Sequence, residues 1–385
     1  MIYINAVGAL NALGNTLDEM ADNLAGGVAP GMRPDGGWLV QGKACWTGNV
    51  DADLPAIPSA LAEHDSRNNR LLLAALAQIR PQVDKAIARF GADRVAVILG
   101  TSTSGLDEAD RYVSSKLPSY RYAQQELGDP SRFLAAYLRL NGPAYTLSTA
   151  CSSSARALIS GKRLIDAGLA DAAIVGGADT LSRMPLNGFD SLESLSPTRC
   201  QPFSERRNGI TIGEGAALML ISGEPDGVSL LGVGESSDAH HMSAPHPEGE
   251  GAARAIRMAL AHAGLRPEDI GYINLHGTAT RLNDRIEAKV VQSIFGERVP
   301  CSSTKHLTGH TLGAAGICEA AICWLLLTRD LPLPPQDFSQ GARDETLPPC
   351  GLLSEPGRLA RPVILSNSFA FGGNNACLIV GKAHG

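Results

Sequence analysis

Residues 145–159 read Tyr145-Thr-Leu-Ser-Thr-Ala-Cys151-Ser-Ser-Ser-Ala155-Arg-Ala-Leu-Ile159, which predicts a short apolar strand that ends at a single cysteine and passes directly into a helix. In that position Cys151 lies at a helix N-terminus, where unpaired backbone N–H groups and the positive end of the helix dipole favour the thiolate over the thiol. The small serines that follow leave a thioester room to approach. Most free cysteines are inert buried residues, so this stretch alone leaves a structural role for Cys151 open.

Two later blocks place histidine and lysine side chains at the ends of predicted elements. The expected strand 270–275 is followed by His276-Gly-Thr-Ala-Thr. The second block contains Lys305 and His310 and leads through a Gly/Ala turn into the apolar helical run 317–327. A single histidine at a strand end is more often structural, but three such blocks in one chain, counting that of Cys151, favour a catalytic site.

Short apolar stretches alternate with amphipathic helical stretches along the chain, which is typical of an α/β fold with buried sheets. A short internal echo relates residues 97–103 to residues 273–280, each a strand followed by a Gly/Thr turn. The echo alone is too short to establish a duplication. The expected strands are residues 94–99, 172–175, 216–221, 270–275, 363–365 and 376–380, and the expected helices are residues 70–79, 155–167 and 252–263.

Composition and charge narrow the class of protein. The chain has 385 residues, of which 44% are hydrophobic and 19% charged, so it can bury a large core. Its net charge of -6 argues against a nucleic-acid-binding surface as the main function. The eight cysteines show no Cys-x-x-Cys pairing, the N-terminus does not resemble a signal peptide, and the run 317–327 is too short to span a bilayer. We therefore expect a cytoplasmic enzyme without a membrane span.

Four motifs, in family order, resemble those of the beta-ketoacyl-acyl-carrier-protein synthases of the decarboxylating Cys-His-His type, and the resemblance covers essentially the whole chain. It implies a thiolase-like fold of duplicated, layered α-β-α-β-α halves with a cap and dimer-interface region at residues 107–140 and 188–209. The expected halves are residues 1–225, which carry the cysteine and the cap, and residues 226–385, which carry the histidines and the lysine. The motifs are Thr-Ala-Cys151-Ser-Ser, His276-Gly-Thr-Ala-Thr with Asn283-Asp284 downstream, Thr-Lys305-His-x-x-Gly-His310-x-x-Gly-Ala-Ala-Gly, and Asn367-Ser-Phe-Ala-Phe371-Gly-Gly.

The resemblance implies a catalytic role for each matched residue. Cys151 would accept an acyl group from a carrier-protein thioester. His276 and His310, donating from neutral rings, would stabilise the enolate that forms when malonyl-carrier protein loses CO2. The backbone N–H groups of Cys151 and Phe371 would form the oxyanion hole for the condensation step. Lys305 would orient the His310 side of the site, with Glu319 as its partner; the alternative for Lys305 is a solvated loop residue.

Several of the residues expected to bind the substrate also have a structural interpretation. Thr278 and Thr280 match family residues that hydrogen-bond the phosphopantetheine arm, but for either one alone simple turn chemistry is as good an interpretation. Phe371 could gate the acyl pocket or fill the core. Phe369 and Ile210 are expected on the pocket wall, where the chain departs from the family: Ala370 replaces a usual glycine, and Ile210 a common aromatic residue. These departures favour a specialised synthase, such as those of bacterial aryl-polyene or polyketide pathways.

The resemblance also sets expectations for cofactors and partners. No metal and no resident cofactor are expected, because the phosphopantetheine is carried by the acyl-carrier-protein substrate, and the histidines at 240, 241 and 246 lack matching acidic or thiol ligands. The expected partners are the acyl carrier protein and, in a homodimer or a heterodimer, a related synthase-like subunit. A local basic patch could steer an acidic carrier protein, and the candidates are Arg67, Arg70, Arg206 and Arg207.

Two other classes of protein share this type of fold. A non-catalytic chain-length partner subunit typically lacks the nucleophile, whereas Cys151, His276 and His310 are all present. A non-decarboxylating thiolase would carry a second catalytic cysteine near the C-terminus, and the cysteine found there, Cys377, is predicted to lie in the core.

Overall fold

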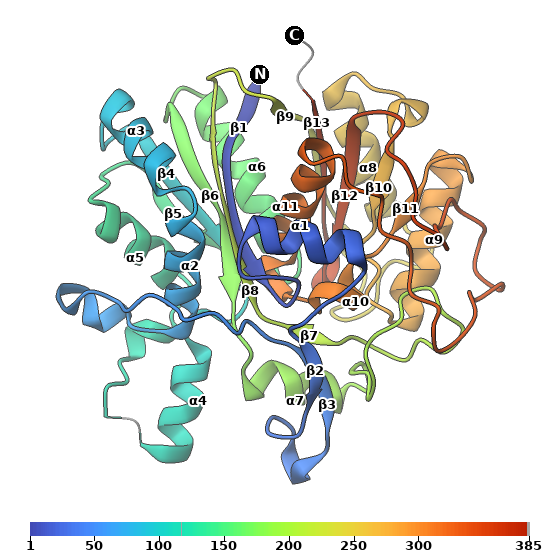
Figure 1. The fold of residues 1–385 in the computed structure, drawn as a ribbon, viewed down its shortest axis with the longest axis horizontal. Helices are drawn as coiled ribbons and strands as arrows, with labels where there is room; N and C mark the ends of the chain where they lie inside the picture. The colour runs from blue at the N-terminus through green and yellow to red at the C-terminus, as the bar shows by residue number, and fades with distance from the viewer. Residues whose placement is uncertain (117, 383–385) are drawn as a thin grey trace.

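A ten-stranded mixed sheet forms the centre of the protein (Figure 1). The computed structural model describes residues 1–116 and 118–382. Along the sheet the strands follow the order β11-β10-β12-β13-β9-β1-β8-β6-β4-β5. Their bounds are β1 (Ile2–Asn11), β4 (Val95–Gly100), β5 (Ala144–Leu147), β6 (Ala172–Asp179), β8 (Gly215–Ser222), β9 (Val228–Ser237), β10 (Tyr272–Asn274), β11 (Cys301–Ser302), β12 (Val363–Phe369) and β13 (Asn374–Lys382).

The two halves of this sheet have the same pairing pattern. In one half β4 pairs in parallel with β5 and β6, and β6, β8 and β1 follow antiparallel. In the other half β10 pairs in parallel with β11 and β12, and β12, β13 and β9 follow antiparallel. The antiparallel pair β1 and β9 joins the halves. The predicted duplicated, thiolase-like α/β fold is therefore confirmed, and the sequence echo begins on the equivalent strands β4 and β10.

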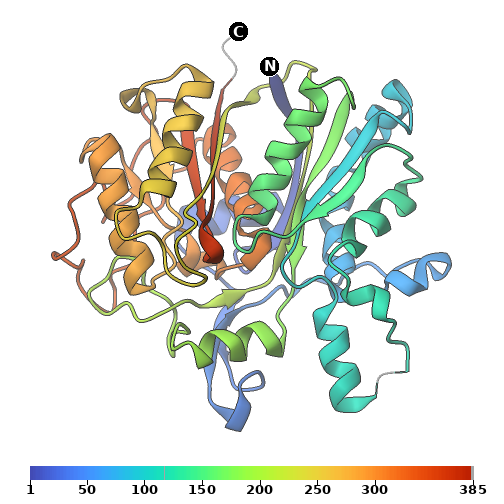
Figure 2. The same cartoon turned by 180° about the vertical axis from the view of Figure 1, so that it is seen from behind.

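Helices fill the space between the half-sheets and cover their outer faces (Figure 2). The central helices α6 and α11 pack against each other and against strands of both halves, and their side chains belong to one apolar core. Outer helices α2 and α5 cover the first half, and α8 and α9 cover the second. The bounds of the helices are α1 (Leu17–Gly26), α2 (Arg67–Ala77), α3 (Arg80–Phe90), α4 (Leu106–Ser115), α5 (Asp129–Leu138), α6 (Ser153–Asp166), α7 (Arg183–Ser191), α8 (Glu250–Ala263), α9 (Arg281–Phe295), α10 (Lys305–Thr308) and α11 (Ala315–Thr328).

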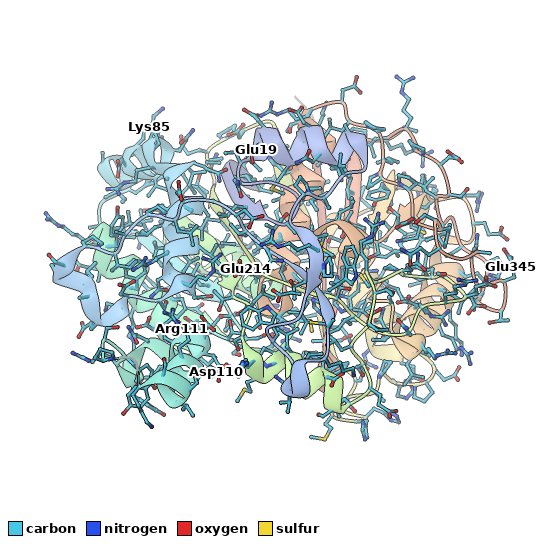
Figure 3. The ribbon with its side chains drawn as sticks, turned by 60° about the horizontal axis from the view of Figure 1, so that its bottom comes forward. Glu19, Lys85, Asp110, Arg111, Glu214 and Glu345 are labelled. Atoms are coloured by element: carbon cyan, nitrogen blue, oxygen red, sulfur yellow. The ribbon has the colours of Figure 1, made fainter. Side chains whose placement is uncertain are left out.

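A cap lies below the large sheet in the view of Figure 1. It contains α4, α7 and a small three-stranded sheet of β2 (Met32–Asp35), β3 (Cys45–Gly48) and β7 (Ile212–Gly213). Figure 3 shows the charged side chains of Asp110 and Arg111 on α4 in this region. The expected cap segment 107–140 is only partly correct, because α5 packs on β4, β5 and α2 in the outer layer. Its apolar residues Phe133 and Leu134 are fully buried there. The segment was assigned to the cap because it lacks the alternating pattern of a strand, and that absence does not distinguish a buried helix from a cap.

The predicted elements agree with the structure except at their ends. All six expected strands are present as β4, β6, β8, β10, β12 and β13, although β10 is shorter than the apolar run that predicted it. The three expected helices correspond to α2, α6 and α8, each beginning two or three residues earlier than predicted. Within the described part of the chain, no helix has both the length and the hydropathy needed to cross a membrane.

Strands β4 and β6 approach each other closely at Gly100 and Gly177. This contact predicts how a substitution there changes the stability of the protein. A Cβ atom at Gly177 would lie 2.1 Å from the backbone oxygen of Gly100. Gly177→Ala should lower the free energy of unfolding by about 1–3 kcal/mol, because the paired strands must separate to accept the methyl group. Gly223→Ala, where no atom lies within 4 Å of the added Cβ, is the matched control. Denaturant unfolding checks this, and equal midpoints for the two variants would contradict it.

Candidate active site

Four of the six predicted catalytic residues lie just after the carboxyl ends of strands from both halves of the sheet. Cys151 follows β5, His276 follows β10, Lys305 follows β11 and Phe371 follows β12. His310 lies in the turn after α10, where its backbone N–H donates to the carbonyl of Thr211 beside β7. The duplicated fold thus brings together residues that are up to 220 positions apart in the sequence.

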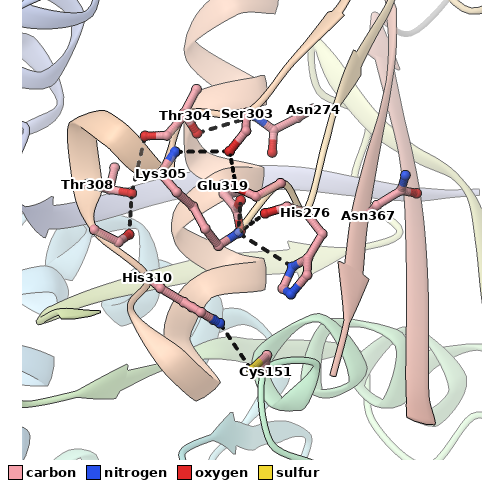
Figure 4. A network of polar contacts seen from close by, with 12 residues as sticks. Cys151, Asn274, His276, Ser303, Thr304, Lys305, Thr308, His310, Glu319 and Asn367 are labelled. Atoms are coloured by element: carbon pink, nitrogen blue, oxygen red, sulfur yellow. Dashed lines mark hydrogen bonds and ion pairs between the residues drawn. The ribbon is translucent and has the colours of Figure 1, made fainter. Parts of the chain in front are cut away.

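Cys151, His276 and His310 form a compact buried cluster (Figure 4). Nε2 of His310 lies 3.1 Å from the Cys151 sulfur. The two imidazole rings are 5.4 Å apart between centroids and nearly perpendicular, at 88°. The Cys151 sulfur and one ring nitrogen from each histidine all lie within 4.8 Å of one another. A thioester carbonyl placed in this space would face both rings and the sulfur together.

Hydrogen bonds to Nδ1 determine where each histidine carries its proton. The backbone N–H of Leu312 donates to Nδ1 of His310 at 3.2 Å. The ammonium group of Lys305 lies 3.4 Å from Nδ1 of His276 and has only donors to offer. In each neutral ring Nδ1 is therefore the acceptor and Nε2 carries the hydrogen. Both histidines can donate from Nε2, which is what stabilisation of a developing oxyanion requires.

The electrostatics of the site keep both histidines neutral. Burial lowers the pKa of His276 well below its usual value, and the charge of Lys305 lowers it further. The pKa of His310 is lowered in the same way, first by burial and then by Lys305. The pair therefore remains uncharged across the physiological pH range and acts as a set of hydrogen-bond donors without binding a proton.

The protonation state predicted for Cys151 is wrong. Helix α6 does begin just after it, at Ser153, but burial raises the pKa of the Cys151 thiol to about 11. Lys305 and the backbone N–H groups of Phe371 and Cys151 act in the opposite direction and do not outweigh the loss of hydration. The resting group is therefore a thiol. Those two N–H groups nevertheless face the sulfur, as an oxyanion hole at this position would require.

Serine side chains hold the backbone turn that presents the cysteine. Ala150, directly before Cys151, has a φ of 52°, a left-handed conformation that non-glycine residues rarely adopt. The hydroxyl of Ser153 donates to the carbonyl of Ala150 at 2.6 Å and accepts from the N–H of Thr149 at 2.9 Å. Ser152 donates to the carbonyl of Thr149 at 2.8 Å. These serines leave room near the thiol and also stabilise a strained turn.

Lys305 acts on the His276 side of the site, which corrects the expectation that it orients His310. Its ammonium group donates to Oε1 of Glu319 at 2.8 Å and to the backbone oxygen of His276 at 2.6 Å. The lysine side chain is only 1% exposed and that of Glu319 only 2%, so a solvated loop lysine is excluded. The predicted partnership of Lys305 with Glu319 is confirmed.

Glu287 is a site residue that the sequence interpretation missed. Its carboxylate accepts from the backbone N–H groups of His276 and Gly277, both at 2.7 Å. The side-chain amides of Asn283 and Asn367 donate to the same carboxylate at 3.2 and 3.3 Å. Burial raises the pKa of Glu287 to about 7. Its position one helical turn after Asn283, within the motif region, was the available signal.

A cavity of 430 Å³ opens onto the catalytic cluster. Phe371 is half-buried on its wall, with its ring 5.4 Å from that of Phe189, so it lies where a gate would act. The hydroxyl oxygens of Thr278 and Thr280 lie 2.9 Å apart, so these residues stabilise their own turn and also face the cavity. All five predicted substrate-binding residues line the cavity, namely Thr278, Thr280, Ile210, Phe369 and Phe371, and the lining residues that were missed include Phe189, Arg281 and Leu282.

The arginines predicted to dock a carrier protein are largely committed to internal contacts. Arg67 donates to the carboxylate of Glu214 at 2.7 and 3.0 Å, and Figure 3 labels this glutamate. Arg70 makes a bidentate ion pair with Asp65 at 2.7 and 2.8 Å. Their charges are therefore already balanced within the chain.

The other two candidate arginines differ from each other. The Arg207 side chain is 4% exposed and donates to Asp344 at 2.6 Å, so the expectation that it meets a carrier protein is wrong. Its partner Asp344 lies 137 positions away, so the local sequence does not show this contact. Arg206 is exposed, and no ion pair is found for it among the described residues.

Comparison with known proteins agrees with this geometry. The family models described as "Beta-ketoacyl synthase, N-terminal domain" and "Beta-ketoacyl synthase, C-terminal domain" match residues 2–226 and 228–337. The 3-oxoacyl-[acyl-carrier-protein] synthase 2 of a Synechocystis species is 30% identical and aligns over 99% of this chain and 98% of its own. The same-named protein of Staphylococcus aureus strain COL is 33% identical over 76% of each chain. The chain belongs to the beta-ketoacyl synthase family.

Solved structures show the same likeness. A chain of the Xenorhabdus doucetiae complex of the ketosynthase ApeO with its chain length factor ApeC is 66% identical, with a TM-score of 0.98 over 99% of this chain and 98% of that one. A beta-ketoacyl synthase from Burkholderia phymatum is 27% identical, with a TM-score of 0.88 over 100% and 99% of the two chains. The protein is thus an acyltransferase of the ketosynthase type.

Cys377 is the cysteine near the C-terminus, where a thiolase would carry its second catalytic cysteine. It is fully buried on β13, as predicted.

The buried Lys305–Glu319 pair gives a prediction that separates stability from catalysis. Lys305→Met should lower the free energy of unfolding by about 3–5 kcal/mol, because Glu319 is left as an uncompensated buried acid. The double variant Lys305→Met with Glu319→Gln should regain most of that stability, since no net charge remains buried. Neither variant should regain full activity, because Nδ1 of His276 has lost its donor. Denaturant unfolding and an assay of malonyl decarboxylation provide the two measurements, and equal stability of the single and double variants would contradict the prediction.

Proposed function

We propose that the protein condenses an acyl group held on Cys151 with the malonyl group of an acyl carrier protein, with loss of CO2. The observation that carries this proposal is the pair of neutral histidines whose Nε2–H groups converge with the cysteine sulfur on one buried cavity. Donors fixed in place before the reaction are what decarboxylation to an enolate needs, because no reorganisation cost is paid when charge develops.

The reaction divides into two halves that use the same cluster. In the first, the Cys151 thiol attacks the acyl thioester, the bond between the acyl carbon and the sulfur of the carrier's phosphopantetheine breaks, and the cysteine proton passes to that leaving sulfur. In the second, malonyl thioester loses CO2, and its oxygen accepts hydrogen bonds from Nε2 of His276 and His310. The enolate carbon then attacks the acyl group on Cys151, and the tetrahedral oxyanion is held by the N–H groups of Cys151 and Phe371. Collapse of that intermediate frees the cysteine and leaves a beta-ketoacyl group on the carrier. No resident cofactor takes part.

A second synthase-like subunit is the proposed structural partner. The ketosynthase ApeO was solved in complex with its chain length factor, and a 26% identical relative is the ishigamide ketosynthase/chain length factor. In this chain β5 ends the large sheet, so its outer edge is open to pairing. Large apolar side chains are exposed on and near α4, including Val113 at 72% and Tyr122 at 68%. An open edge and an apolar surface of this kind are typical of a subunit interface.

The substrate range proposed here is that of a specialised synthase. The identity to the ApeO complex chain is 66%, against 30 to 33% for the synthase 2 relatives. Ala370 and Ile210, the two positions that depart from the family pattern, both line the catalytic cavity. These observations favour a bacterial aryl-polyene or polyketide pathway over housekeeping fatty-acid synthesis.

Loss of the nucleophile is the direct test of this function. Cys151→Ala should leave the fold intact and abolish acyl-enzyme formation, since only a small side chain is removed. Intact-protein mass spectrometry after incubation with an acyl-carrier protein measures the adduct. Cys200→Ala is the matched control, because that cysteine is also buried but lies outside the lining of the cavity. An adduct that persists on the Cys151→Ala protein would show that Cys151 is not the nucleophile.

The histidines should separate the two half-reactions. His276→Ala and His310→Ala are each expected to accept an acyl group on Cys151 and to lose malonyl decarboxylation by ~10²–10³-fold, the usual cost of one oxyanion donor. Release of CO2 from malonyl-carrier protein, with an acylated carrier supplied as primer, is the measurement. His306→Ala, a buried histidine of the neighbouring helix α10 that does not line the cavity, serves as the control. Near-normal CO2 release from either active-site variant would show that its ring does not hold the enolate.

A further inference from the structure

Asp179 is a fully buried acid directly beneath the active site that the reaction steps above do not use. It ends β6, the strand of the first half that corresponds to β12 in the second. No cation pairs with it among the described residues, although its side chain is completely inaccessible to solvent. A buried acid without a counter-ion lowers the stability of the fold, which suggests that Asp179 serves the active site.

The partners of Asp179 are all donors from one loop. Its Oδ1 accepts from the hydroxyls of Thr101 at 2.6 Å and Thr103 at 2.7 Å. The same oxygen accepts from the backbone N–H groups of Ser102 at 2.9 Å and Thr103 at 2.8 Å. Burial has the largest effect on Asp179 and raises the pKa of its carboxyl, and these donors oppose it because every one of them offers a hydrogen to the carboxylate.

The loop that Asp179 holds connects to both Cys151 and His310. The hydroxyl of Ser102 lies 3.5 Å from the carbonyl oxygen of Ala150, the strained residue before the nucleophile. On the other side, a Cβ at Gly313 would lie 2.7 Å from both Oδ2 of Asp179 and the nitrogen of Ser102. Gly313 belongs to the turn whose Leu312 N–H fixes the His310 ring. The carboxylate is therefore packed between the segments that carry the sulfur and the imidazole.

We infer that Asp179 is a positioning residue that clamps residues 101–103 and 312–314 beside the segments that carry Cys151 and His310, and that through them it sets the reactivity of the Cys151 thiol. The clamp maintains the 3.1 Å approach of His310 to Cys151. The charge opposes Lys305, whose ammonium group favours the thiolate. A resting thiol reacts slowly with adventitious electrophiles, so nucleophilicity is kept low until a thioester occupies the cavity.

The ionisable groups around these two residues define what a pH experiment would report. Cys151 faces Lys305 and the two neutral histidines; burial is the largest cause of the raised pKa of its thiol, and Asp179 adds to that rise. Asp179 also raises the pKa of Cys318 on α11, a buried thiol that lies outside the cavity lining. Removal of the negative charge should therefore lower the pKa of Cys151 and increase its thiolate fraction at neutral pH.

The first test requires no substrate and so does not depend on the proposed function. In Asp179→Asn, alkylation of Cys151 by iodoacetamide at pH 7.5 should become faster, and the inflection of its pH profile should move to lower pH, because an acid that raises the pKa of the thiol is removed. Peptide mapping distinguishes Cys151 from the other thiols. The control is Asp171→Asn, just before the other end of β6 and roughly 26 Å away, where the acid is exposed and paired with Arg94. A folded Asp179→Asn protein whose alkylation profile matches that of the wild type would overturn the inference.

The second test concerns the clamp and rests on the proposed condensation. Thr103→Val removes one donor and keeps the charge, so kcat should fall about tenfold or more, as small misplacements of reacting groups typically cause, with little change in KM. Thr103→Ser retains the hydroxyl and should restore the rate. Equal rates for the valine and serine variants would overturn the clamp even if Asp179→Asn did not fold. A wild-type enzyme inactive with malonyl-carrier protein would instead refute the proposed function and leave the alkylation result standing.

Discussion

The buried ion pair of Lys305 and Glu319 is the interaction on which the arrangement of the active site depends. It neutralises a lysine that has lost its hydration, and it leaves the remaining ammonium hydrogens to bind the carbonyl and Nδ1 of His276. Burial lowers the pKa of both histidines, and the same positive charge lowers it further. A single buried cation thus fixes the tautomer of one ring and helps to keep both rings neutral, and α11 must pack centrally to bring Glu319 within its reach.

The thiol is governed by a balance of opposing effects in a site that excludes water. Lys305 and two backbone N–H groups favour the thiolate, whereas desolvation and Asp179 favour the thiol. Desolvation is the largest of these, so a position near a helix N-terminus is not sufficient to ionise a buried cysteine. Reactivity must then depend on the substrate, whose thioester carbonyl can be polarised by the same donors. This is consistent with a nucleophile that is selective for a thioester held in the cavity.

Much of the site was predictable because its residues lie at strand ends. Cys151, His276 and Lys305 each follow a parallel strand, and alternating apolar runs locate such strands from sequence alone. The catalytic cluster and the five cavity-lining residues were identified from the resemblance of the four motifs to those of the beta-ketoacyl synthases. Asp179 and Glu287 were missed because a carboxylate next to a strand or in a helix looks ordinary until its partners are known, and those partners lie up to 80 positions away for Glu287 and 76 or more for Asp179.

The sequence by itself determined the alternation of strands and helices, the family and the identity of the nucleophile and the two histidines, because these depend on local periodicity and on short motifs. Only the tertiary structure decided which side of the site Lys305 serves, that Arg207 is buried against Asp344, and that Cys151 rests as a thiol. Each of these depends on burial or on a charge from a distant segment. Electrostatic effects in a low-dielectric interior act through space between elements, and the order of residues along the chain does not specify those distances.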